Sequence, residues 1–488
     1  MRSLEIVLAI VNSALLMILF SKAGRRKKTV ASLFILSLTA SLLQLILEGY
    51  RWQMLPLYSI PFILFVVFLR LSLSDRQENS SLPFKWSIRR RFIIMMTAVL
   101  YILVSIVLPV VFPVFSWRQP EGPYPIGTVS YHWEYRGKSN VYGHQEGNPR
   151  ELAVQIWYPA ASESTGERSP YIQHPQVFMD TARQTYGMPD FPFRSMTTTK
   201  TNAIIDADLS GEPSRFPLLL FSHGLGSSGS LHTEQIEQLV SQGYIIASIE
   251  HTGYALYSVS SDGSKTRFVE DESFTAYEDE IMNEIWLEDA KFVLNQLEQM
   301  AQNDPQKRFT GRIDLDKIGY FGHSFGGALA VQMLQSDSRI KAALNMDGTF
   351  AGKLIGSDGF QKPFMWMVTA EPEPVGISDF PDEQLAEMGL NKEKAKKLEE
   401  EWKRRHAQAA ARGNYKAILT YADHMSFSDI YYVSPLTEWF LGVNMDETHK
   451  TMNDLSLLFF DTYVKGTSSN GLDKVVGSHP SFLLYRGD

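Results

Sequence analysis

The chain has 488 residues, of which 44% are hydrophobic and 20% charged, with a net charge of −8 and no cysteine. This length exceeds the roughly 100–200 residues of a usual domain, and the averages exclude a disordered chain, a collagen-like chain and a strongly basic nucleic-acid-binding protein. The lack of cysteine excludes disulfide frameworks, thiolate metal sites and cysteine nucleophiles.

The charge is unevenly distributed along the chain. Residues 1–118 contain fourteen basic and four acidic residues, a net charge of +10, whereas the remainder contains 32 basic and 50 acidic residues, a net charge of −18. We therefore predict two physically different parts, a membrane anchor over residues 1–118 and a second domain over residues 119–488.

Four apolar runs fill the N-terminal part, over residues 4–20, 30–47, 55–69 and 92–115. A helix needs about 20 apolar residues to cross a bilayer, and the second and fourth runs meet this requirement well. The first and third runs are shorter and are weakened by Glu5, Asn12, Pro56 and Pro61. The first run resembles a signal peptide only partly, because it lacks a small-residue cleavage site and its basic stretch follows the apolar run. We expect four spans.

The basic residues between the runs predict the orientation. They gather in residues 22–28 and 70–91, whereas the turn between the second and third runs offers only Arg51 beside an acid. Because basic loops stay on the cytoplasmic side, we expect a multi-pass protein of the cell membrane whose second domain is extracytoplasmic. Glu5 and Asn12 are the only strongly polar candidates for a transport path, so the region is interpreted as an anchor.

Strand-like and helix-like patterns alternate after residue 125. Short apolar runs occur over residues 152–158, 216–222, 244–249, 318–322, 342–346, 364–369 and 417–421. Helical patterns between them include residues 233–242, 285–300 and 326–335. This alternation predicts an α/β fold with a mostly parallel sheet and helices on both faces, in which functional residues lie at the carboxyl ends of strands.

The strongest motif is GHSFG over residues 322–326, with Ser324 at its centre. It follows a strand-like run directly and begins a helical pattern, which is the strand–turn–helix setting of a nucleophile elbow. The glycines permit the sharp turn that exposes the serine hydroxyl. We therefore predict Ser324 as a nucleophile, which needs a base to take its proton.

In this class of sheet the chain order is serine, then acid, then histidine. The histidines after Ser324 are His406, His424, His449 and His479. His424 is the preferred base because it follows the strand-like run 417–421, where a loop can carry it over the elbow. The acid stays open between Asp347 and Glu371, which each end a strand-like run, with Asp423 third because it adjoins His424.

An oxyanion hole needs preorganised backbone N–H donors. The residue after the nucleophile, Phe325, is the first candidate. The second is Leu225, in the loop HGLGSS over residues 223–228 that follows the strand-like run 216–222. A plain tight turn is the alternative interpretation of this loop.

Together these stretches resemble the platelet-activating factor acetylhydrolases of the plasma and intracellular type II family. The matching stretches are FPLLLFSHGLG (216–226), GYIIASIEH (243–251), IGYFGHSFGG (318–327), the strand ending at Asp347, and HMSFSD (424–429). The resemblance covers roughly residues 153–466 and implies an α/β-hydrolase fold, with Asp347 favoured over Glu371 and with Leu225 and Phe325 as oxyanion donors. It also implies short-acyl or oxidised phospholipid substrates.

Two features depart from this family. Its members are not built on four transmembrane spans, so the anchor gains no support from the likeness. Residues 382–412 form a charged insertion with helical spacing of acids and bases, which predicts a solvated helix held by i, i+4 pairs. A lid is the alternative for this insertion, and residues 258–277 are a second lid candidate.

Two functions from different classes follow. The first is a membrane-anchored serine hydrolase of carboxylic esters that uses Ser324, Asp347 and His424, acts on a lipid or small ester, and needs no metal or organic cofactor and no nucleic acid. The second is a membrane sensor or scaffold whose hydrolase-like domain binds a ligand without turnover. The complete Ser, His and acid set favours the enzyme.

Overall fold

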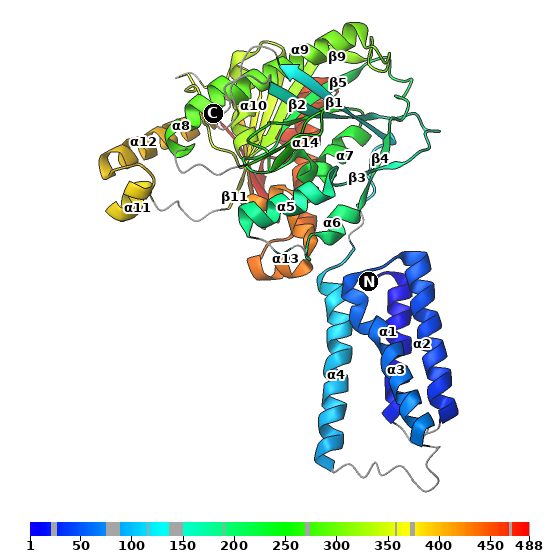
Figure 1. The fold of residues 1–488 in the computed structure, drawn as a ribbon. Helices are drawn as coiled ribbons and strands as arrows, with labels where there is room; N and C mark the ends of the chain where they lie inside the picture. The colour runs from blue at the N-terminus through cyan, green and yellow to red at the C-terminus, as the bar shows by residue number, and fades with distance from the viewer. Residues whose placement is uncertain are drawn as a thin grey trace. The chain divides into compact units, whose positions relative to one another are not determined.

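The computed structural model describes residues 1–487 except 21–26, 75–87, 115–116, 136–149, 188, 190, 269–273, 357–358, 371–375 and 468–470. The chain divides into two compact units, namely Met1–Phe115 with Val433–Leu436, and Ser116–Tyr432 with Thr437–Asp488. Each unit is described by itself (Figure 1).

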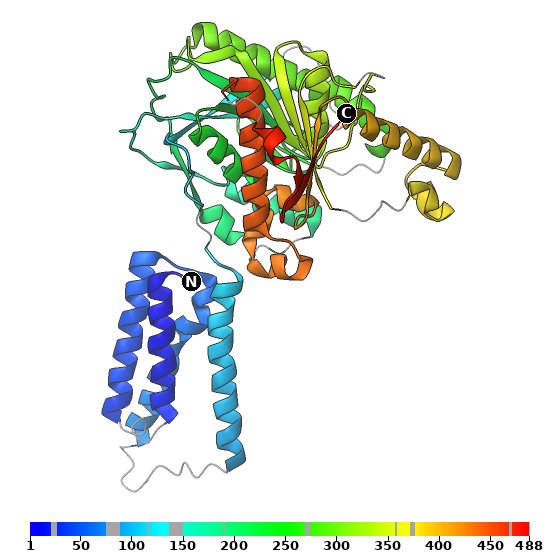
Figure 2. The same ribbon diagram turned by 180° about the vertical axis from the view of Figure 1, so that it is seen from behind.

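The first unit contains four helices that lie side by side in Figures 1 and 2. They are α1 (Ser3–Phe20), α2 (Lys27–Glu48), α3 (Leu55–Ser74) and α4 (Ile88–Val111). Within the described residues, three stretches are long and apolar enough to cross a membrane: Lys28–Glu48, Trp52–Arg70 and Phe92–Val111. The apolar helix Ser3–Leu19 is shorter. By length and composition the structure therefore offers three candidate spans where the sequence predicted four.

The two polar residues that weaken the first apolar run have partners on neighbouring segments. The carboxylate of Glu5 lies 2.8 and 2.9 Å from Nη1 of Arg51, and both side chains are buried. Asn12 donates to the carbonyl oxygen of Leu57 (3.1 Å) and accepts from the Ser37 hydroxyl (2.6 Å). These contacts join α1 to α2, to the start of α3 and to the turn before it.

The second unit is built on one large sheet. Its strands are β1 (Ile126–Tyr135), β2 (Arg150–Pro159), β3 (Arg168–Pro170), β4 (Lys200–Ile205), β5 (Phe216–Ser222), β6 (Ile245–Glu250), β9 (Ile313–His323), β10 (Ile340–Met346), β11 (Phe364–Thr369), β12 (Tyr415–Leu419), β13 (Gly477–Ser478) and β14 (Phe482–Arg486). Among the described residues their order is β13-β14-β12-β11-β10-β9-β5-β6-β2-β1-β4-β3. The six strands from β12 to β6 are parallel, and β2 and β14 flank them antiparallel. A separate short hairpin pairs β7 (Tyr257–Val259) with β8 (Lys265–Arg267).

Helices cover both faces of this sheet (Figures 1 and 2). On one face lie α9 (Leu287–Asn303) and α10 (Phe325–Ser336), and on the other α7 (Thr233–Ser241) and α14 (Met445–Phe460). The other helices are α5 (Pro175–Tyr186), α6 (Arg194–Thr198), α8 (Phe274–Ile281), α11 (Asp382–Glu387), α12 (Lys392–Ala409) and α13 (Pro435–Leu441). Strand β5 shows why both faces are covered. Leu218 and Leu220 belong to the core under α9 and α10, and Leu219 and Phe221 to the core under α7 and α14. Because successive side chains of a strand point to opposite faces, a continuous apolar run marks a strand buried on both.

The predicted mostly parallel α/β sheet is confirmed, and the architecture fits the α/β-hydrolase fold. Each strand-like run of the sequence corresponds to a strand, with bounds that shift by a few residues. The sequence missed the strands at the two ends of the sheet. In β1, for example, the second half alternates between exposed and half-buried residues and therefore lacks a long apolar run.

Candidate functional site

Ser324 lies at the sharp turn between β9 and α10. Its backbone has φ 55° and ψ −123°, a left-handed conformation that is rare for a residue with a side chain. The Ser324 N–H donates to the carbonyl oxygen of Met346 at the end of β10 (2.9 Å), which holds the turn in place. Such a strained position is typical of functional sites, where the surrounding structure maintains it.

The glycines of the motif are required by close packing. A Cβ on Gly322 would lie 2.2 Å from the carbonyl oxygen of Gly326. A Cβ on Gly326 would lie 2.0 Å from the carbonyl oxygen of Ser222. No side chain fits at these distances. The absence of both side chains therefore lets β9, the start of α10 and the end of β5 meet closely under Ser324.

His424 begins a short 3₁₀ turn, His424–Phe427, after β12. Its Nε2 lies 3.1 Å from Oγ of Ser324. Two neighbours hold the backbone of His424: Asp423 caps the turn by accepting from the N–H of Ser426 (3.0 Å), and Nε2 of His323 donates to the His424 carbonyl oxygen (2.9 Å). Burial lowers the pKa of His323 well below its ordinary value, so this ring is neutral.

Asp347 follows β10 with a positive φ of 53°. Its Oδ2 lies 2.7 Å from Nδ1 of His424, and its Oδ1 accepts the N–H of Thr369 (3.1 Å). The structure thus brings Ser324, His424 and Asp347 into one hydrogen-bonded array. The other acid candidate, Glu371, lies outside the described residues.

The remaining candidates have other partners. The Asp423 carboxylate accepts from Ser426 and from the Tyr431 hydroxyl (2.8 Å). His449 is buried against Glu234 (2.8 Å), and Nε2 of His479 lies 2.7 Å from the carbonyl oxygen of Val475. His406 packs against the rings of Phe350 and Trp366, and burial lowers its pKa to about 4.

The loop 223–228 approaches Ser324 through its glycine. A Cβ on Gly224 would lie 2.9 Å from Cβ of Ser324, so only a bare backbone fits there. Within the described part of the chain, the N–H of the next residue, Leu225, has no hydrogen-bond partner. Phe325, directly after Ser324, is the first residue of α10. Both predicted oxyanion donors therefore belong to segments that meet at Ser324.

Sequence reasoning missed a carboxyl group that holds this loop. Oε1 of Glu250, at the end of β6, accepts from the N–H of Gly229 (2.7 Å) and from the hydroxyl of Ser228 (2.9 Å). Burial raises the pKa of Glu250 to about 7. The sequence did contain a signal for Glu250, because it directly follows a strand-like run and precedes another polar residue, His251.

His251 belongs to a second Ser–His–Asp array that the sequence did not reveal. Its Nε2 lies 2.9 Å from Oγ of Ser222, and its Nδ1 lies 3.0 Å from Oδ2 of Asp289. Arg150 donates two hydrogen bonds to the same carboxylate (2.7 and 2.6 Å). All four residues are buried. They come from four distant elements, which is why no local motif marks them.

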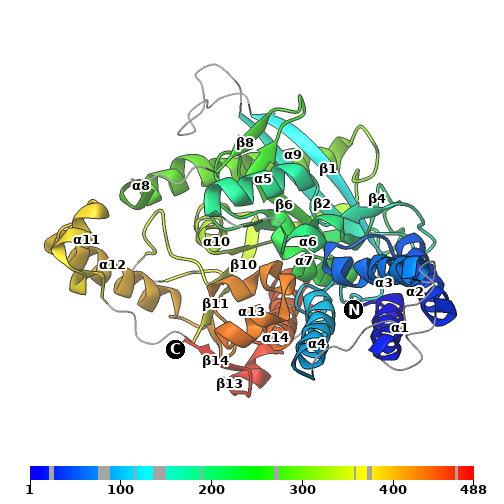
Figure 3. The same ribbon diagram turned by 60° about the horizontal axis from the view of Figure 1, so that its bottom comes forward.

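The charged insertion contains α11 and α12, which lie beside α8 in Figure 3. Three ion pairs between residues i and i+4 lie along α12, namely Glu393–Lys397, Glu399–Lys403 and Glu401–Arg405. The buried guanidinium of Arg405 also reaches Asp279 of α8 (3.1 Å). Residues 392–409 thus form a helix with i, i+4 pairs, whose Ala395, Arg405 and Ala409 are buried, and a lid role for the insertion stays a prediction. Of the second lid candidate, residues 269–273 lie outside the described part.

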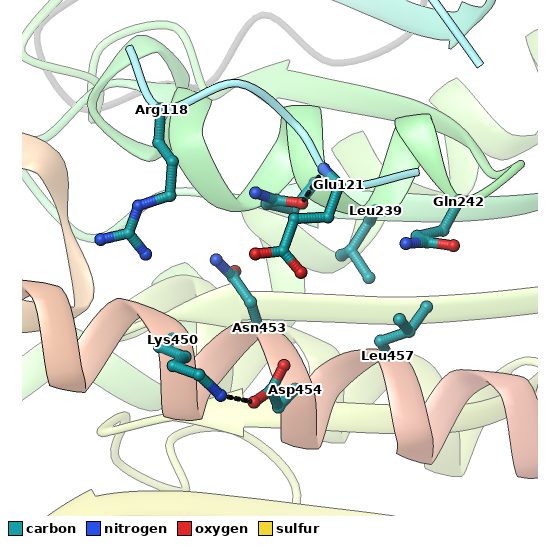
Figure 4. A pocket seen from close by; sticks show the side chains of 9 residues that line it. Arg118, Glu121, Leu239, Gln242, Lys450, Asn453, Asp454 and Leu457 are labelled. Atoms are coloured by element: carbon teal, nitrogen blue, oxygen red, sulfur yellow. Dashed lines mark hydrogen bonds and ion pairs between the residues drawn. The ribbon is translucent and has the colours of Figure 1, made fainter. Parts of the chain in front are cut away.

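A polar pocket lies elsewhere in this unit (Figure 4). It is lined by Arg118, Glu121, Gln238, Leu239, Gln242, Lys450, Asn453, Asp454 and Leu457. Lys450 and Asp454, one turn apart on α14, form an ion pair of 2.6 Å along one wall of it. None of the residues of the Ser324 array lines this pocket. Among the described residues, no group of three or more His, Asp or Glu side chains is arranged to hold a metal ion.

Comparison with known proteins finds similarity to platelet-activating factor acetylhydrolases and to esterases. Residues 111–351, which include Ser324 and Asp347 and end before His424, match the family model of platelet-activating factor acetylhydrolase, isoform II. A platelet-activating factor acetylhydrolase of Bos taurus is 25% identical over 265 residues, which are 46% of this chain and 53% of the relative. A probable 1-alkyl-2-acetylglycerophosphocholine esterase of Arthroderma benhamiae is 27% identical over 166 residues, 32% of this chain and 38% of the relative.

The chain thus spans about half the length of the Bos taurus relative. A ferulic acid esterase from Streptomyces cinnamoneus has a similar fold, with a TM-score of 0.58 and 23% identity over 77% of this chain and 100% of that chain. The resemblance to the platelet-activating factor acetylhydrolase family, first indicated by the sequence motifs, is therefore confirmed for this chain.

Proposed function

We propose that this protein is a membrane-anchored serine hydrolase of carboxylic esters, with an anchor over residues 1–118 and a catalytic domain over residues 119–488. The observation that carries the proposal is the hydrogen-bonded array of Ser324, His424 and Asp347 at the carboxyl ends of β9, β12 and β10. This arrangement supplies a nucleophile, a base and an orienting carboxylate, which together perform acyl transfer. The names of the relatives, an acetylhydrolase and two esterases, support an ester as the substrate.

In the proposed reaction, Oγ of Ser324 attacks the ester carbonyl carbon while its proton passes to Nε2 of His424. Asp347 holds Nδ1 of the imidazole and stabilises the cation that forms. The N–H groups of Leu225 and Phe325 bind the oxygen that becomes negative. His424 then protonates the departing alcohol. Water next attacks the acyl-enzyme, gives its proton to His424, and releases the acid as the proton returns to Ser324.

The proposed substrate is a lipid ester with a short or oxidised acyl chain. Two relatives are named for acetyl esters, which are short acyl groups. A catalytic domain tethered to a bilayer meets such lipids at high local concentration. The test of this part is the dependence of kcat/KM on acyl length, which should fall from acetyl to palmitoyl esters.

The proposed topology has four spans and an extracytoplasmic catalytic domain. The polar contacts of Glu5 and Asn12 with neighbouring segments support α1 as a member of the bundle. The side of the catalytic domain depends on α4 alone, because Arg89, Arg90 and Arg91 lie near its start and the domain follows its end. Basic residues at the start place that end of α4 in the cytoplasm. A reporter fused after Arg118 should be active only outside the cytoplasm, and activity only inside would contradict the topology.

The enzyme proposal is tested with p-nitrophenyl acetate and p-nitrophenyl palmitate on the full chain. Wild type should hydrolyse the acetate and Ser324→Ala should fall to the background rate. Ser336→Ala is the matched control, because Ser336 is the last residue of α10 and its hydroxyl donates to the Gln332 carbonyl oxygen (2.7 Å). Equal rates for wild type and Ser324→Ala on both esters would overturn the proposal and favour a binding protein without turnover.

A further inference from the structure

His223 is the first residue of the loop 223–228 that carries Leu225, and its side chain is buried. Its Nε2 accepts the backbone N–H of His251 (3.2 Å), and its Nδ1 lies 2.7 Å from the carbonyl oxygen of Gly224. A ring nitrogen that accepts carries no proton, so the partners assign the proton of this ring to Nδ1. Nδ1 therefore donates to Gly224. Burial lowers the pKa of His223 to about 3, which keeps the ring in this neutral form at working pH.

The hydrogen bond from His223 fixes the direction of one peptide group. The Gly224 carbonyl and the Leu225 N–H belong to the same planar trans peptide, so they point in opposite directions. The N–H of Ser227 also donates to the Gly224 oxygen (3.1 Å). With the oxygen held by these two donors, the Leu225 N–H is directed away from the His223 ring. It has no partner within the described residues, and its loop is packed against Ser324.

His251, which supports His223, is itself held on several sides. Its ring bonds to Ser222 and Asp289 and stacks on Trp286, with ring centroids 3.9 Å apart and planes at 17°. The backbone N–H that it donates to His223 therefore has a fixed position. The ring of Trp286 also meets the ring of Phe325 edge-on at 4.8 Å. One buried cluster thus contacts both segments that supply the proposed oxyanion donors.

We propose that His223 is a positioning residue that aims the Leu225 N–H at the oxyanion, with the buried array of Ser222, His251 and Asp289 as its support. This inference rests on the proposed function. A donor of this kind stabilises charge that exists only in the transition state, so its misdirection lowers kcat and leaves substrate binding almost unchanged. Loss of one oxyanion donor costs about 10²–10³ in kcat. When the His223 donor is removed, we expect kcat to fall by about 10–100-fold, less than for loss of a whole oxyanion donor, because the Ser227 N–H still holds the Gly224 oxygen.

Two substitutions separate positioning from packing. In His223→Asn, the amide nitrogen occupies the place of Nδ1 and still donates to Gly224. In His223→Gln, the amide oxygen occupies the place of Nε2, accepts the His251 N–H and leaves Gly224 without this donor. Both variants are polar and similar in size. If His223 had only a packing role, both variants would lower Tm, and kcat would not fall in one of them at unchanged Tm.

The experiment measures kcat and KM with p-nitrophenyl acetate, and the affinity for an aryl boronic acid, which forms a tetrahedral adduct with a nucleophilic serine. We expect His223→Gln to lower kcat about 10–100-fold, to change KM less than threefold, and to weaken boronic acid binding by the same factor as kcat. His223→Asn should recover most of the loss. Equal kcat values for the two variants, or losses that follow Tm, would overturn the inference.

The outcomes also separate this inference from the proposed function. If wild type is active, Ser324→Ala is inactive and the two His223 variants are alike, the positioning role fails and the esterase stands. If wild type has no esterase activity above Ser324→Ala, both fail. If neither His223 variant folds, His223 is a packing residue and the inference fails.

Discussion

The second unit contains two Ser–His–Asp arrays that share residue types and hydrogen bonds but differ in their surroundings. In the first, Nε2 of His424 lies 3.1 Å from Ser324 and its Nδ1 lies 2.7 Å from Asp347. In the second, the corresponding contacts of His251 are 2.9 and 3.0 Å. Geometry alone therefore does not distinguish them.

Exposure and charge do distinguish the arrays. The side chain of His424 is 43% exposed, whereas that of His251 is fully buried. Asp289 is neutralised by two hydrogen bonds from Arg150, and the Ser222 hydroxyl is occupied by the Tyr320 hydroxyl at 2.8 Å. A buried, fully partnered array has no room for substrate and no free nucleophile. The same chemical pattern therefore occurs once at an exposed candidate nucleophile and once inside the core.

The largest expected effect breaks the exposed array. Asp347→Asn should lower kcat for p-nitrophenyl acetate by roughly 10⁴, because an amide no longer holds the imidazole in the right tautomer or stabilises its cation. Glu371→Gln should leave the rate near wild type and serves as the matched control. A loss confined to Glu371→Gln would assign the acid to that residue instead.

The same substitution in the buried array should affect stability more than catalysis. Asp289→Asn leaves Arg150 buried without its counter-charge, which costs about 3–5 kcal/mol in the free energy of unfolding. Denaturant unfolding of the full chain in detergent measures this loss, and we expect kcat to fall no further than in His223→Gln. A loss of kcat as large as that of Asp347→Asn, at wild-type stability, would make the buried array catalytic.

A smaller effect is expected from the contact that supports the exposed array. His323→Leu removes the donor to the His424 carbonyl oxygen, a hydrogen bond worth about 1 kcal/mol, so kcat should fall about fivefold. His323→Gln retains an N–H near the position of Nε2 and should stay closer to wild type. Equal kcat values for the two variants would show that this hydrogen bond does not position His424.

The smallest effect concerns Glu250, whose Oε2 lies 3.5 Å from Nε2 of His223. Its pKa is raised to about 7 in the folded chain, above its unfolded value, so the folded state binds more protons between these two values. This contribution to stability is present at acid pH and is lost as pH rises through about 7. Glu250→Gln keeps an acceptor for Gly229 and cannot ionise.

The measurement is the Tm of Glu250→Gln and of wild type at pH 5 and pH 8. The Tm of the variant relative to that of wild type should be higher at pH 8 than at pH 5, since only wild type must bury a charge at pH 8. A difference in Tm that is the same at both values would contradict the raised pKa of Glu250.

The exposed site was largely predictable from sequence because its signals are local. Ser324 is marked by glycines that the close approach of β9 and α10 requires, and His424 by its place after a strand. The acid was not decidable from the residues alone, because both Asp347 and Glu371 end strand-like runs. Asp347 makes the contact with His424, as the family resemblance implied.

The buried support was not predictable, for a physical reason. Arg150 and Asp289 are 139 residues apart and meet only through the sheet and helix packing. Similarly, Glu5 and Asn12 make the first run less apolar, and their partners Arg51 and Leu57 lie more than 40 residues away along the chain, so the sequence does not show that they are paired. Residue patterns report local geometry well and pairings between distant elements poorly.

Ser324 of the exposed array, and not Ser222 of the buried one, is the proposed nucleophile. The most direct test is fluorophosphonate labelling of the full chain in membranes, followed by peptide mass spectrometry. We expect label on Ser324, its loss in Ser324→Ala, and its retention at Ser324 in Ser222→Ala. Label on Ser222, or no label on Ser324 in the wild-type chain, would show that Ser324 is not the nucleophile.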